Sequence, residues 1–288
     1  MKVTRAADQL DAIPRVVALG TVDGVHLGHR RVLEATLAAG PEPAVVTFDP
    51  HPRTALGNRV ELLTSLERRL ELLGELGVEA TMVVEFTLEV ARLEPEEFAQ
   101  DVLRPMGAEI VVAGEDFRFG RGRSGDLGLL KRLGFETVPV PLLEGVSSSR
   151  IRELVADGDV EEAAKLLGRP VEVEGIVVAG DARGGTLGFP TANLGIRPEL
   201  LVPKNGIYAG AAGEHRAAVS VGTNPHYGGR ERRVEAHLLD FDGDIYGERL
   251  VVQLWERLRD EAAFDSEDDL IAQISRDVEA ARRAKAPA

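Results

Sequence analysis

The chain has 288 residues, a formal net charge of −14 and a hydrophobic fraction of 44%, which suits a globular protein of about two domains with a buried core. The acidic charge argues against a nucleic-acid-binding surface, and the absence of cysteine excludes disulfides, thiolate zinc sites and cysteine nucleophiles. The sequence contains neither an apolar run of the roughly 20 residues that cross a membrane nor a signal segment, so we expect a cytoplasmic protein that does not contact membranes.

The first chemical motif lies where a predicted strand is followed by a predicted helix. The apolar run at residues 16–19 predicts a buried strand, and residues 30–39 predict a helix that ends at a Gly-Pro pair. Between them, Gly20, Gly24 and Gly28 let the backbone come close to a ligand. Because the start of a helix offers unpaired N–H groups and a positive dipole end, the segment is suited to bind a phosphate.

Two histidines belong to the same segment. His26 and His29 are three residues apart, so on a helical turn they share a face. Imidazoles beside an anion can donate hydrogen bonds to phosphoryl oxygens, and the phosphate strengthens these bonds by keeping the rings protonated. A glycine-rich turn with surface histidines is the alternative, but strand, glycines, His-Leu-Gly-His and helix together favour phosphate chemistry.

Strand-like and helix-like segments alternate up to about residue 168. Apolar runs predict further strands at residues 44–48, 81–85 and 109–113. A capping box at Thr64–Glu67 and a proline at position 95 mark the starts of two helices between them. This alternation predicts a doubly wound α/β domain with a parallel sheet, in which ligands bind beyond the carboxyl ends of the strands.

Arginines gather in two later segments of this half. Gly114–Gly120 follows a predicted strand and contains Arg118, with two more arginines close behind, although its phenylalanines could simply fix a loop. A serine-rich segment then opens a helix. One serine is enough for an N-cap, whereas the run Ser147, Ser148 and Ser149 leaves N–H groups and hydroxyls that can face an anion.

The second half changes from alternating elements to strands in succession. A helix at 159–167 ends at a glycine, and a proline follows it, so we predict domains at 1–168 and 169–288. Strands are predicted at residues 171–178, 208–211, 216–221, 234–239 and 250–255. The series predicts a small antiparallel β-barrel, and Ser266 caps a last helix whose apolar face is expected to pack on it.

A glycine-rich segment follows the first of these strands. Gly180, Arg183 and Gly188 belong to a stretch whose backbone N–H groups can surround phosphates, although the chain has no Walker A sequence. Thr191 and Asn193 are two residues apart, so in an extended segment their side-chain oxygens point to one side, and oxygen ligands suit Mg²⁺. A glycine-rich β-turn is the alternative interpretation.

Several of these strings resemble one enzyme family, in the same order along the chain. The tetrad His26–His29 is similar to the HxGH signature of nucleotidylyltransferases, and the longer string from Gly20 resembles the prokaryotic bifunctional riboflavin kinase/FAD synthetases. Gly114–Gly120 resembles their GENFRFG segment, and Ser147–Arg152 resembles their SSTxIR motif. The string that ends in Pro-Thr-Ala-Asn193 looks like their riboflavin kinase signature.

The resemblance implies a nucleotidylyltransferase-like fold for the first domain and a riboflavin kinase-like barrel for the second. It implies that ATP phosphorylates riboflavin to FMN, and that a second ATP adenylylates FMN to FAD with release of pyrophosphate. ATP would then be a substrate of both reactions, Mg²⁺ the cofactor, and riboflavin, FMN and FAD the further partners.

The resemblance also assigns residues to each half. In the first half it implies nucleotide or phosphate binding by Gly20, Asp23, Gly24, Gly28, Ser147, Ser148 and Ser149. His26, His29 and Arg152 are expected to stabilise the departing pyrophosphate. Flavin contacts are expected from Asp116, Phe117 and Arg118, with Asp116 where the family commonly has Asn, and from Arg259 in the second half.

In the kinase half the resemblance implies nucleotide binding by Gly180, Arg183 and Gly188 and metal binding by Thr191 and Asn193. Glu235 matches the family's general base, which takes the proton of the riboflavin 5′-hydroxyl. Its position in the strand pattern alone predicts a solvent-facing glutamate.

Three other functions remain open on the sequence alone. One is a single-activity riboflavin kinase or FMN adenylyltransferase in which the other site has decayed. Another is a nucleotidylyltransferase with a different acceptor. The third is a regulator that binds flavin or nucleotide without turnover. The intact histidine pair, the Pro-Thr-Ala-Asn string and Glu235 favour the bifunctional enzyme over all three.

Overall fold

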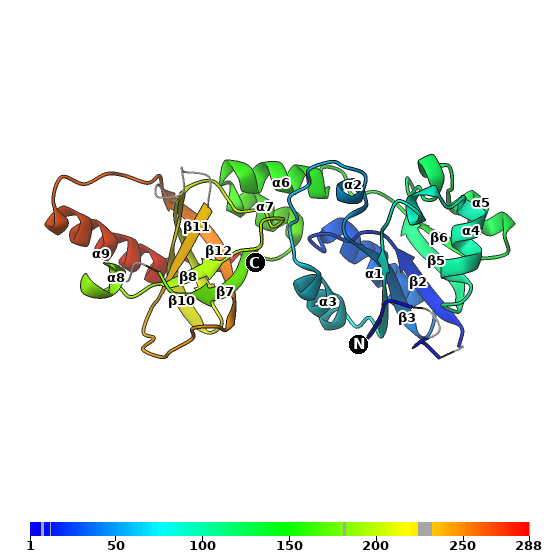
Figure 1. The fold of residues 1–288 in the computed structure, drawn as a ribbon, viewed down its shortest axis with the longest axis horizontal. Coiled ribbons are helices and arrows are strands. Elements are labelled where there is room, and N and C mark those ends of the chain that lie inside the picture. Colours follow the sequence, from blue (N-terminus) through cyan, green and yellow to red (C-terminus); the bar gives the residue numbers. More distant parts are fainter. Residues whose placement is uncertain (7–8, 12, 181–182, 224–231, 288) are drawn as a thin grey trace. The chain divides into compact units, whose positions relative to one another are not determined.

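The computed structural model describes residues 1–6, 9–11, 13–180, 183–223 and 232–287, and the chain forms two compact units, Met1–Val146 and Ser147–Ala288 (Figure 1). The division falls before two helices that the sequence analysis placed in the first domain. The boundary at residue 168 therefore stays a prediction. Within the described part of the chain, no helix is both long and apolar enough to cross a membrane.

The first unit is built on a six-stranded sheet in the order β1-β4-β3-β2-β5-β6, and all its pairings are parallel. Its strands are β1 (Lys2–Thr4), β2 (Arg15–Leu19), β3 (Pro43–Asp49), β4 (Ala80–Glu85), β5 (Ala108–Gly114) and β6 (Glu136–Val140). The chain runs outward from β2 through β3 to β4, and then returns to the other side of β2 with β5. The predicted doubly wound parallel sheet is confirmed.

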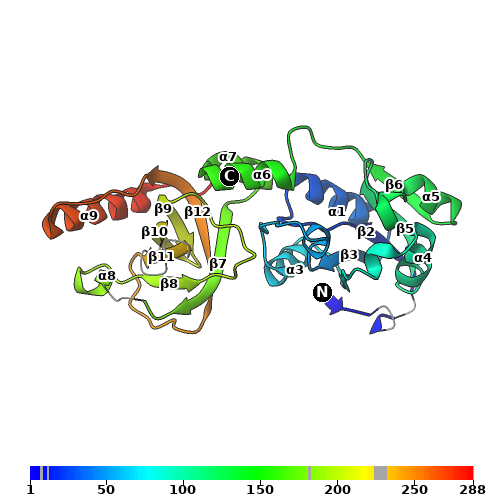
Figure 2. The same cartoon turned by 45° about the horizontal axis from the view of Figure 1, so that its top comes forward.

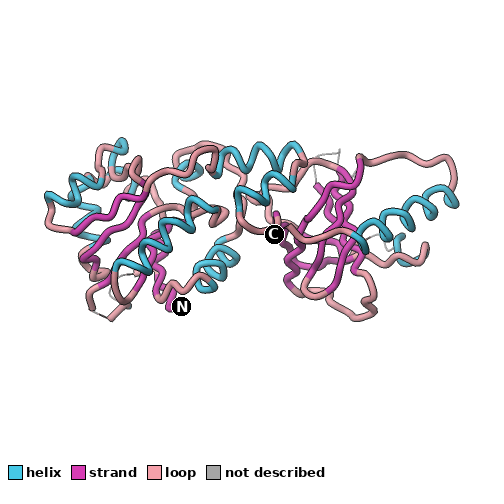
Figure 3. Tube along the Cα trace, turned by 180° about the vertical axis from the view of Figure 1, so that it is seen from behind, coloured by secondary structure: helices cyan, strands magenta, loops and turns pink. Residues whose placement is uncertain are grey.

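Helices cover both faces of this sheet, because successive strand side chains point to opposite sides. Val17 packs into a core with Phe98 and Leu130, whereas Ala18 packs on the other side with Leu33 and Leu73. The helices are α1 (Leu27–Ala39), α2 (Pro52–Ala55), α3 (Leu66–Glu75), α4 (Pro95–Phe98) with its π-helical continuation η3 (Ala99–Leu103), and α5 (Leu127–Arg132). Two 3₁₀ turns, η2 (Val90–Arg92) and η4 (Arg121–Arg123), complete the unit. Figure 3 shows the strands between the helices.

The second unit is a closed barrel in the order β10-β11-β8-β7-β12-β9, with antiparallel pairings throughout. Its strands are β7 (Val171–Val178), β8 (Ala192–Gly195), β9 (Gly206–Ala212), β10 (His215–Thr223), β11 (Arg232–Leu238) and β12 (Arg249–Arg259). Its helices are α6 (Ser148–Asp157), α7 (Val160–Leu167), α8 (Arg183–Thr186) and α9 (Glu267–Arg283). The predicted antiparallel barrel with a C-terminal helix is confirmed.

The barrel has a closed apolar interior, and polar side chains alternate to its outside. On β11, Val234 and Ala236 are fully buried, while Glu235 and His237 alternate with them and are partly exposed. Helix α9 packs outside the barrel against β9 and β10 (Figure 2). The outward-facing side chains of β10 and β11 therefore lie on the wall that α9 partly covers.

Candidate functional sites

The segment between β2 and α1 leaves the sheet at the carboxyl ends of the strands. It lies where the order of the strands reverses, because the chain adds β3 and β4 on one side of β2 and β5 on the other. Val22 and Val25 have φ angles of 43° and 40°, a left-handed conformation that is unusual for β-branched residues. Both side chains are buried, and such backbone strain persists only where the surrounding structure holds it. The strained turn lies where ligands bind in doubly wound sheets.

Asp23 holds this turn to the segment before α3. Its carboxylate, which is only 1% exposed, accepts hydrogen bonds from the backbone N–H groups of Leu63 and Thr64 at 3.1 to 3.2 Å. The Thr64 hydroxyl in turn accepts from the Gly24 N–H at 3.2 Å. Asp23 therefore shapes the turn from inside, and direct contact of its carboxylate with a nucleotide stays a prediction.

The predicted cap of α3 was wrong by one residue. Ser65 is the N-cap and accepts from the Arg68 N–H at 3.0 Å, whereas the sequence pattern favoured Thr64. The Thr64 hydroxyl is instead part of the Asp23 and Gly24 contacts.

The two histidines face one another at the start of α1. The helix begins at Leu27, earlier than predicted, and His26 is its N-cap, with Nδ1 accepting from the His29 N–H at 3.3 Å. The two rings stack with centroids 3.6 Å apart and an interplanar angle of 15°. A Cβ on Gly28 would lie 3.1 Å from the His26 ring, so the glycine between them gives the imidazole its room. The predicted shared face is confirmed.

The Gly114–Phe119 segment emerges from β5, the neighbour of β2, at the same edge of the sheet. Phe117 packs against the apolar core and stacks near Phe119 with centroids 6.0 Å apart, while Asp116 and Arg118 are exposed. The fold thus places the histidine turn and the predicted flavin segment on the two sides of the point where the strand order turns. Ligands bind in this crevice in such sheets.

The serine-rich segment begins α6 as predicted. Ser147 is the N-cap, and its hydroxyl accepts from the Arg150 N–H at 3.2 Å, while Arg150 pairs with Glu153 at 3.3 Å. Ser148 and Arg152 are partly buried, and Ser149 is exposed. These residues belong to the second compact unit, so their joint action with His26 and His29 stays a prediction.

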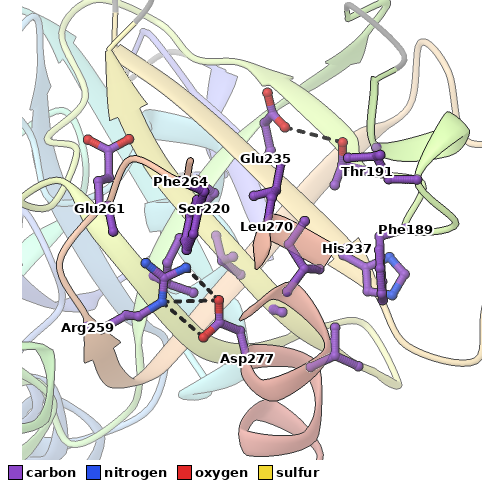
Figure 4. Close-up of a pocket in the computed structure, with 18 residues that line it drawn as sticks. Phe189, Thr191, Ser220, Glu235, His237, Arg259, Glu261, Phe264, Leu270 and Asp277 are labelled. Carbon is purple, nitrogen blue, oxygen red and sulfur yellow. Dashed lines mark hydrogen bonds and ion pairs between the residues drawn. The ribbon is translucent and has the colours of Figure 1, made fainter. Parts of the chain in front are cut away.

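A cavity of about 280 Å³ lies on the outer wall of the barrel, between β10, β11 and α9 (Figure 4). Three residues singled out from the sequence line it: Thr191, Glu235 and Arg259. Leu270 and Ile274 from α9 and Phe264 before it supply apolar surface. The apolar face of α9, expected to be packed core, thus also forms a wall of this cavity.

Glu235 is the centre of a polar cluster at this cavity. The Thr191 hydroxyl donates to Glu235 Oε2 at 3.4 Å, and Arg233 forms an ion pair with Oε1. Across the sheet, Glu235 is paired in register with Asn193 on β8 and with Ser220 on β10. The glutamate that the strand pattern would leave to solvent is therefore surrounded by polar partners.

The side-chain oxygens near Glu235 are of the type that Mg²⁺ prefers. Asn193 Oδ1 accepts from Arg233 Nε and Nη2 at 3.1 and 2.9 Å, so a cation already lies against this oxygen. Amide and hydroxyl oxygens are hard ligands of the kind Mg²⁺ takes together with substrate phosphates. Among the described residues, no group of three or more His, Cys, Asp or Glu side chains could hold a metal ion.

The glycine-rich segment is fitted closely to Asn193. A Cβ on Gly180 would lie 2.2 Å from the Asn193 amide nitrogen, so only glycine leaves that side chain its place. Gly188 has a φ of +86°, a conformation that favours glycine, and a Cβ built there would have no described atom within 4 Å. Arg183 begins α8, and its side chain lies outside the described part of the structure.

Arg259 reaches the cavity from the end of β12 and is bound to α9. Its Nε and Nη2 donate to the Asp277 carboxylate at 3.0 and 2.7 Å, and Gln273 donates to the same carboxylate at 2.8 Å. The guanidinium also lies 5.9 Å from the centroid of the Phe264 ring. Arg259 therefore helps to shape the cavity, and its contact with a flavin stays a prediction.

Comparison with known proteins decides the family. A model described as FAD synthetase matches residues 8–151, and a model described as riboflavin kinase matches residues 167–285. A bifunctional riboflavin kinase/FMN adenylyltransferase of Listeria monocytogenes is 38% identical over 94% of this chain and 92% of its own. The protein of that name from Escherichia coli K12 is 36% identical over 98% and 97%. This chain belongs to the bifunctional riboflavin kinase/FMN adenylyltransferase family.

A solved structure from Streptococcus pneumoniae supports the same fold for this riboflavin kinase/FMN adenylyltransferase family member. That crystal structure is described as a macrolide-efflux protein. It matches with a TM-score of 0.88 at 34% identity and covers 98% of this chain and 99% of its own. The likeness concerns the fold, and the efflux description is a statement about the pneumococcal protein.

Sequence reasoning missed several buried charged residues in this family member, among them Arg69 and Asp277. Arg69 is 2% exposed, and its Nη1 donates to the Thr47 hydroxyl at 3.3 Å; that hydroxyl donates to the Thr21 carbonyl at 2.9 Å, next to the strained turn. Burial lowers the pKa of Arg69, and the charges of Asp23 and Asp49 oppose this shift. Arg69 and Asp277 each stand at a position where the apolar face of a predicted helix is interrupted by a charge. That interruption was the signal in the sequence that could have identified them.

Proposed function

We propose that this chain catalyses both reactions for which its relatives are named. In the first, the γ-phosphoryl group of ATP is transferred to riboflavin to give FMN and ADP. In the second, FMN attacks a second ATP to give FAD and pyrophosphate. The observation that carries the proposal is the pair Thr191 and Glu235 in the cavity wall, with Asn193 opposite Glu235 on the neighbouring strand, in a chain that matches both family models. Because ATP is made inside cells, we propose a cytoplasmic location.

In the kinase reaction, Glu235 acts as the general base. Its carboxylate accepts the proton of the riboflavin 5′-hydroxyl while that oxygen bonds to the γ-phosphorus and the bond to the ADP oxygen breaks. The hydrogen bond from Thr191 supports this role, because it fixes the orientation of the carboxylate, and in this structure Arg233 also pairs with it. Apolar groups of α9 and Phe264 offer the flat flavin a surface beside it.

Thr191 and Asn193 would hold Mg²⁺ through their side-chain oxygens. The ion would supply positive charge to the phosphates of the nucleotide when bound. Gly180 supports this assignment, since a larger residue there would displace the Asn193 amide.

In the adenylyltransferase reaction, an FMN phosphate oxygen bonds to the α-phosphorus of ATP as the bond to pyrophosphate breaks. His26 and His29 donate to phosphate oxygens from the start of α1, where the helix dipole also favours negative charge. The positively charged guanidinium of Arg152 stabilises the negative charge of the departing pyrophosphate. The stacked rings and the strained turn that carries them support this role, because they place the donors before the substrate binds.

Chromatography of flavins tests the proposal. Purified protein is incubated with riboflavin, ATP and Mg²⁺, with His29→Ala and Glu235→Ala run beside the wild type. We expect FAD from the wild type, FMN accumulation from His29→Ala, and little product from Glu235→Ala unless FMN is supplied.

Each other outcome selects one of the alternative functions. A wild type that stops at FMN would be a riboflavin kinase alone, and one that needs added FMN would be an adenylyltransferase alone. Flavin binding without consumption of ATP would indicate a regulator.

A further inference from the structure

Arg233 lies at the position where the proposed metal site has its oxygen donors. It is on the same outer face of β11 as Glu235, two residues along the strand. Its Nε and Nη2 donate to Asn193 Oδ1 at 3.1 and 2.9 Å, and its Nε also pairs with the Glu235 carboxylate. One guanidinium therefore joins the proposed metal ligand to the proposed base.

These contacts compete with metal binding. Asn193 has a single side-chain oxygen with two lone pairs, and two N–H groups of Arg233 point at it. A divalent ion that binds this oxygen must replace at least one of those hydrogen bonds. It would also be repelled by a guanidinium that remained in contact with the same oxygen.

We propose that Arg233 is an internal counter-cation that occupies the metal position until metal and nucleotide arrive, and that it must leave Asn193 before Mg²⁺ binds there. The inference rests on the proposed metal site. The nucleotide phosphates offer the displaced guanidinium a new anionic partner, so metal that arrives with nucleotide is favoured over metal alone. Arg233 thereby makes the site selective for the metal–nucleotide complex.

Binding of Mn²⁺, a paramagnetic substitute for Mg²⁺, to the nucleotide-free full-length protein tests this. The electron paramagnetic resonance signal of free Mn²⁺ gives the Kd. We expect Arg233→Met to bind Mn²⁺ about tenfold more tightly than the wild type, since it fills similar space without a charge. Arg282→Met is the matched control: Arg282 is on α9, outside the cavity lining, and the substitution removes the same charge from its exposed ion pair with Asp240, which follows β11.

Two comparisons separate the possible failures. Equal Kd values for Arg233→Met and the wild type, or an equal gain in Arg282→Met, would overturn the role of Arg233. Adding Asn193→Ala to Arg233→Met is expected to abolish the gain. If Asn193→Ala leaves the Kd unchanged in both backgrounds, the proposed metal site itself is wrong.

A thermal unfolding curve and adenylylation of supplied FMN show whether each variant keeps its fold. A second variant provides an independent test in case Arg233→Met does not. Arg233→Lys keeps the charge but lacks the two-pronged donor that bridges Asn193 and Glu235. We expect it to bind Mn²⁺ more tightly than the wild type, by a smaller factor than Arg233→Met. An unchanged Kd in the lysine variant would contradict the proposal.

Discussion

Glu235 combines two properties that a general base needs, a fixed orientation and access to a cavity. It sits between the fully buried Val234 and Ala236, which hold β11 in the barrel wall, so its own side chain must point outward. Thr191 and Arg233 then contact one carboxylate oxygen each. The orientation of the carboxylate follows from strand alternation and two neighbours.

The substitution Glu235→Gln tests the role of Glu235 as the general base, because it replaces one carboxylate oxygen by an amide nitrogen. The amide keeps the size of the side chain but cannot accept the hydroxyl proton, so we expect riboflavin phosphorylation to fall about 10²–10⁴-fold. Adenylylation of supplied FMN should be unchanged. Glu256→Gln, on the exposed side of β12, is the control and should keep both rates. A kinase rate that survives Glu235→Gln would show that another group takes the proton.

In the first unit, the substitution Gly28→Ala tests the role of the histidine pair. In Gly28→Ala the new Cβ would press on the His26 ring, 3.1 Å away, and shift the imidazole from its stacked position. Because a small misplacement of a catalytic group is costly, we expect FMN adenylylation to fall about 10²-fold while riboflavin phosphorylation is kept. Gly74→Ala in α3 meets only Met1 at 3.7 Å and should be active in both assays. An unchanged FAD yield in Gly28→Ala would contradict the role of the histidine pair.

At the scale of elements, an ion pair between Asp277 and Arg259 adds to the apolar packing of α9 on the barrel. Asp277 is 6% exposed and binds Arg259 at the end of β12. Truncation of Asp277 to Ala would leave the Arg259 guanidinium without this carboxylate, so we expect a loss of about 3 kcal/mol in the free energy of unfolding of the second unit.

Chemical denaturation followed by the fluorescence of Trp255 measures this loss. Trp255 is the only tryptophan in the sequence, and it packs with Ala281 of α9, so its emission reports on the same contact. Glu279→Ala, which removes exposed ion pairs on the same helix, is the control and should cost less than about 0.5 kcal/mol. Equal losses in the two variants would mean that Asp277 does not hold α9 in place.

The elements themselves were largely predictable, because each is marked by local signals. The apolar run at residues 171–178 became β7 with the same bounds, and Ser266 caps α9 as expected. The cap of α3 was not predictable, since Thr64 and Ser65 both carry a hydroxyl. Contacts with Asp23 and Gly24, distant in sequence, decide which one caps the helix.

The chemistry of the sites was predictable only where it rests on a local string. That His26 and His29 share a face could be predicted from their spacing, whereas the stacking of their rings was seen only in the structure. The contact of Arg233 with Asn193 depends on the register between β8 and β11, which no local pattern fixes. The same holds for Arg259 and Asp277, whose pairing depends on where α9 packs.

At the scale of the whole molecule, the same limit applies to α6 and α7, which lie between the last sheet strand and the first barrel strand in the sequence. The pattern of residues 160–167 shows that α7 has an apolar face, but not which unit covers that face. In the structure α7 packs against β7 and β12, and its buried residues are Val160, Ala163, Ala164 and Leu167. The glycine and proline that follow it therefore lie inside the second unit, at the join between a helix and the first barrel strand.

Two fragments test this assignment of α6 and α7. Residues 147–288 keep both helices, whereas residues 169–288 lose them and expose the barrel surface beneath α7. Burial of a large aliphatic side chain is worth about 1.5–3 kcal/mol, so loss of the contacts of Val160 and Leu167 should cost about 3–6 kcal/mol.

Denaturation followed by Trp255 fluorescence should therefore show a lower midpoint for 169–288 than for 147–288. Riboflavin phosphorylation by fragment 147–288 is the control that its barrel is native. Equal midpoints would mean that α7 contributes nothing to the barrel, and would favour a boundary at residue 168. A lower midpoint for 169–288 would place the functional boundary of the kinase before Ser147. The predicted phosphate residues Ser147, Ser148, Ser149 and Arg152 would then belong to the same stable unit as the barrel.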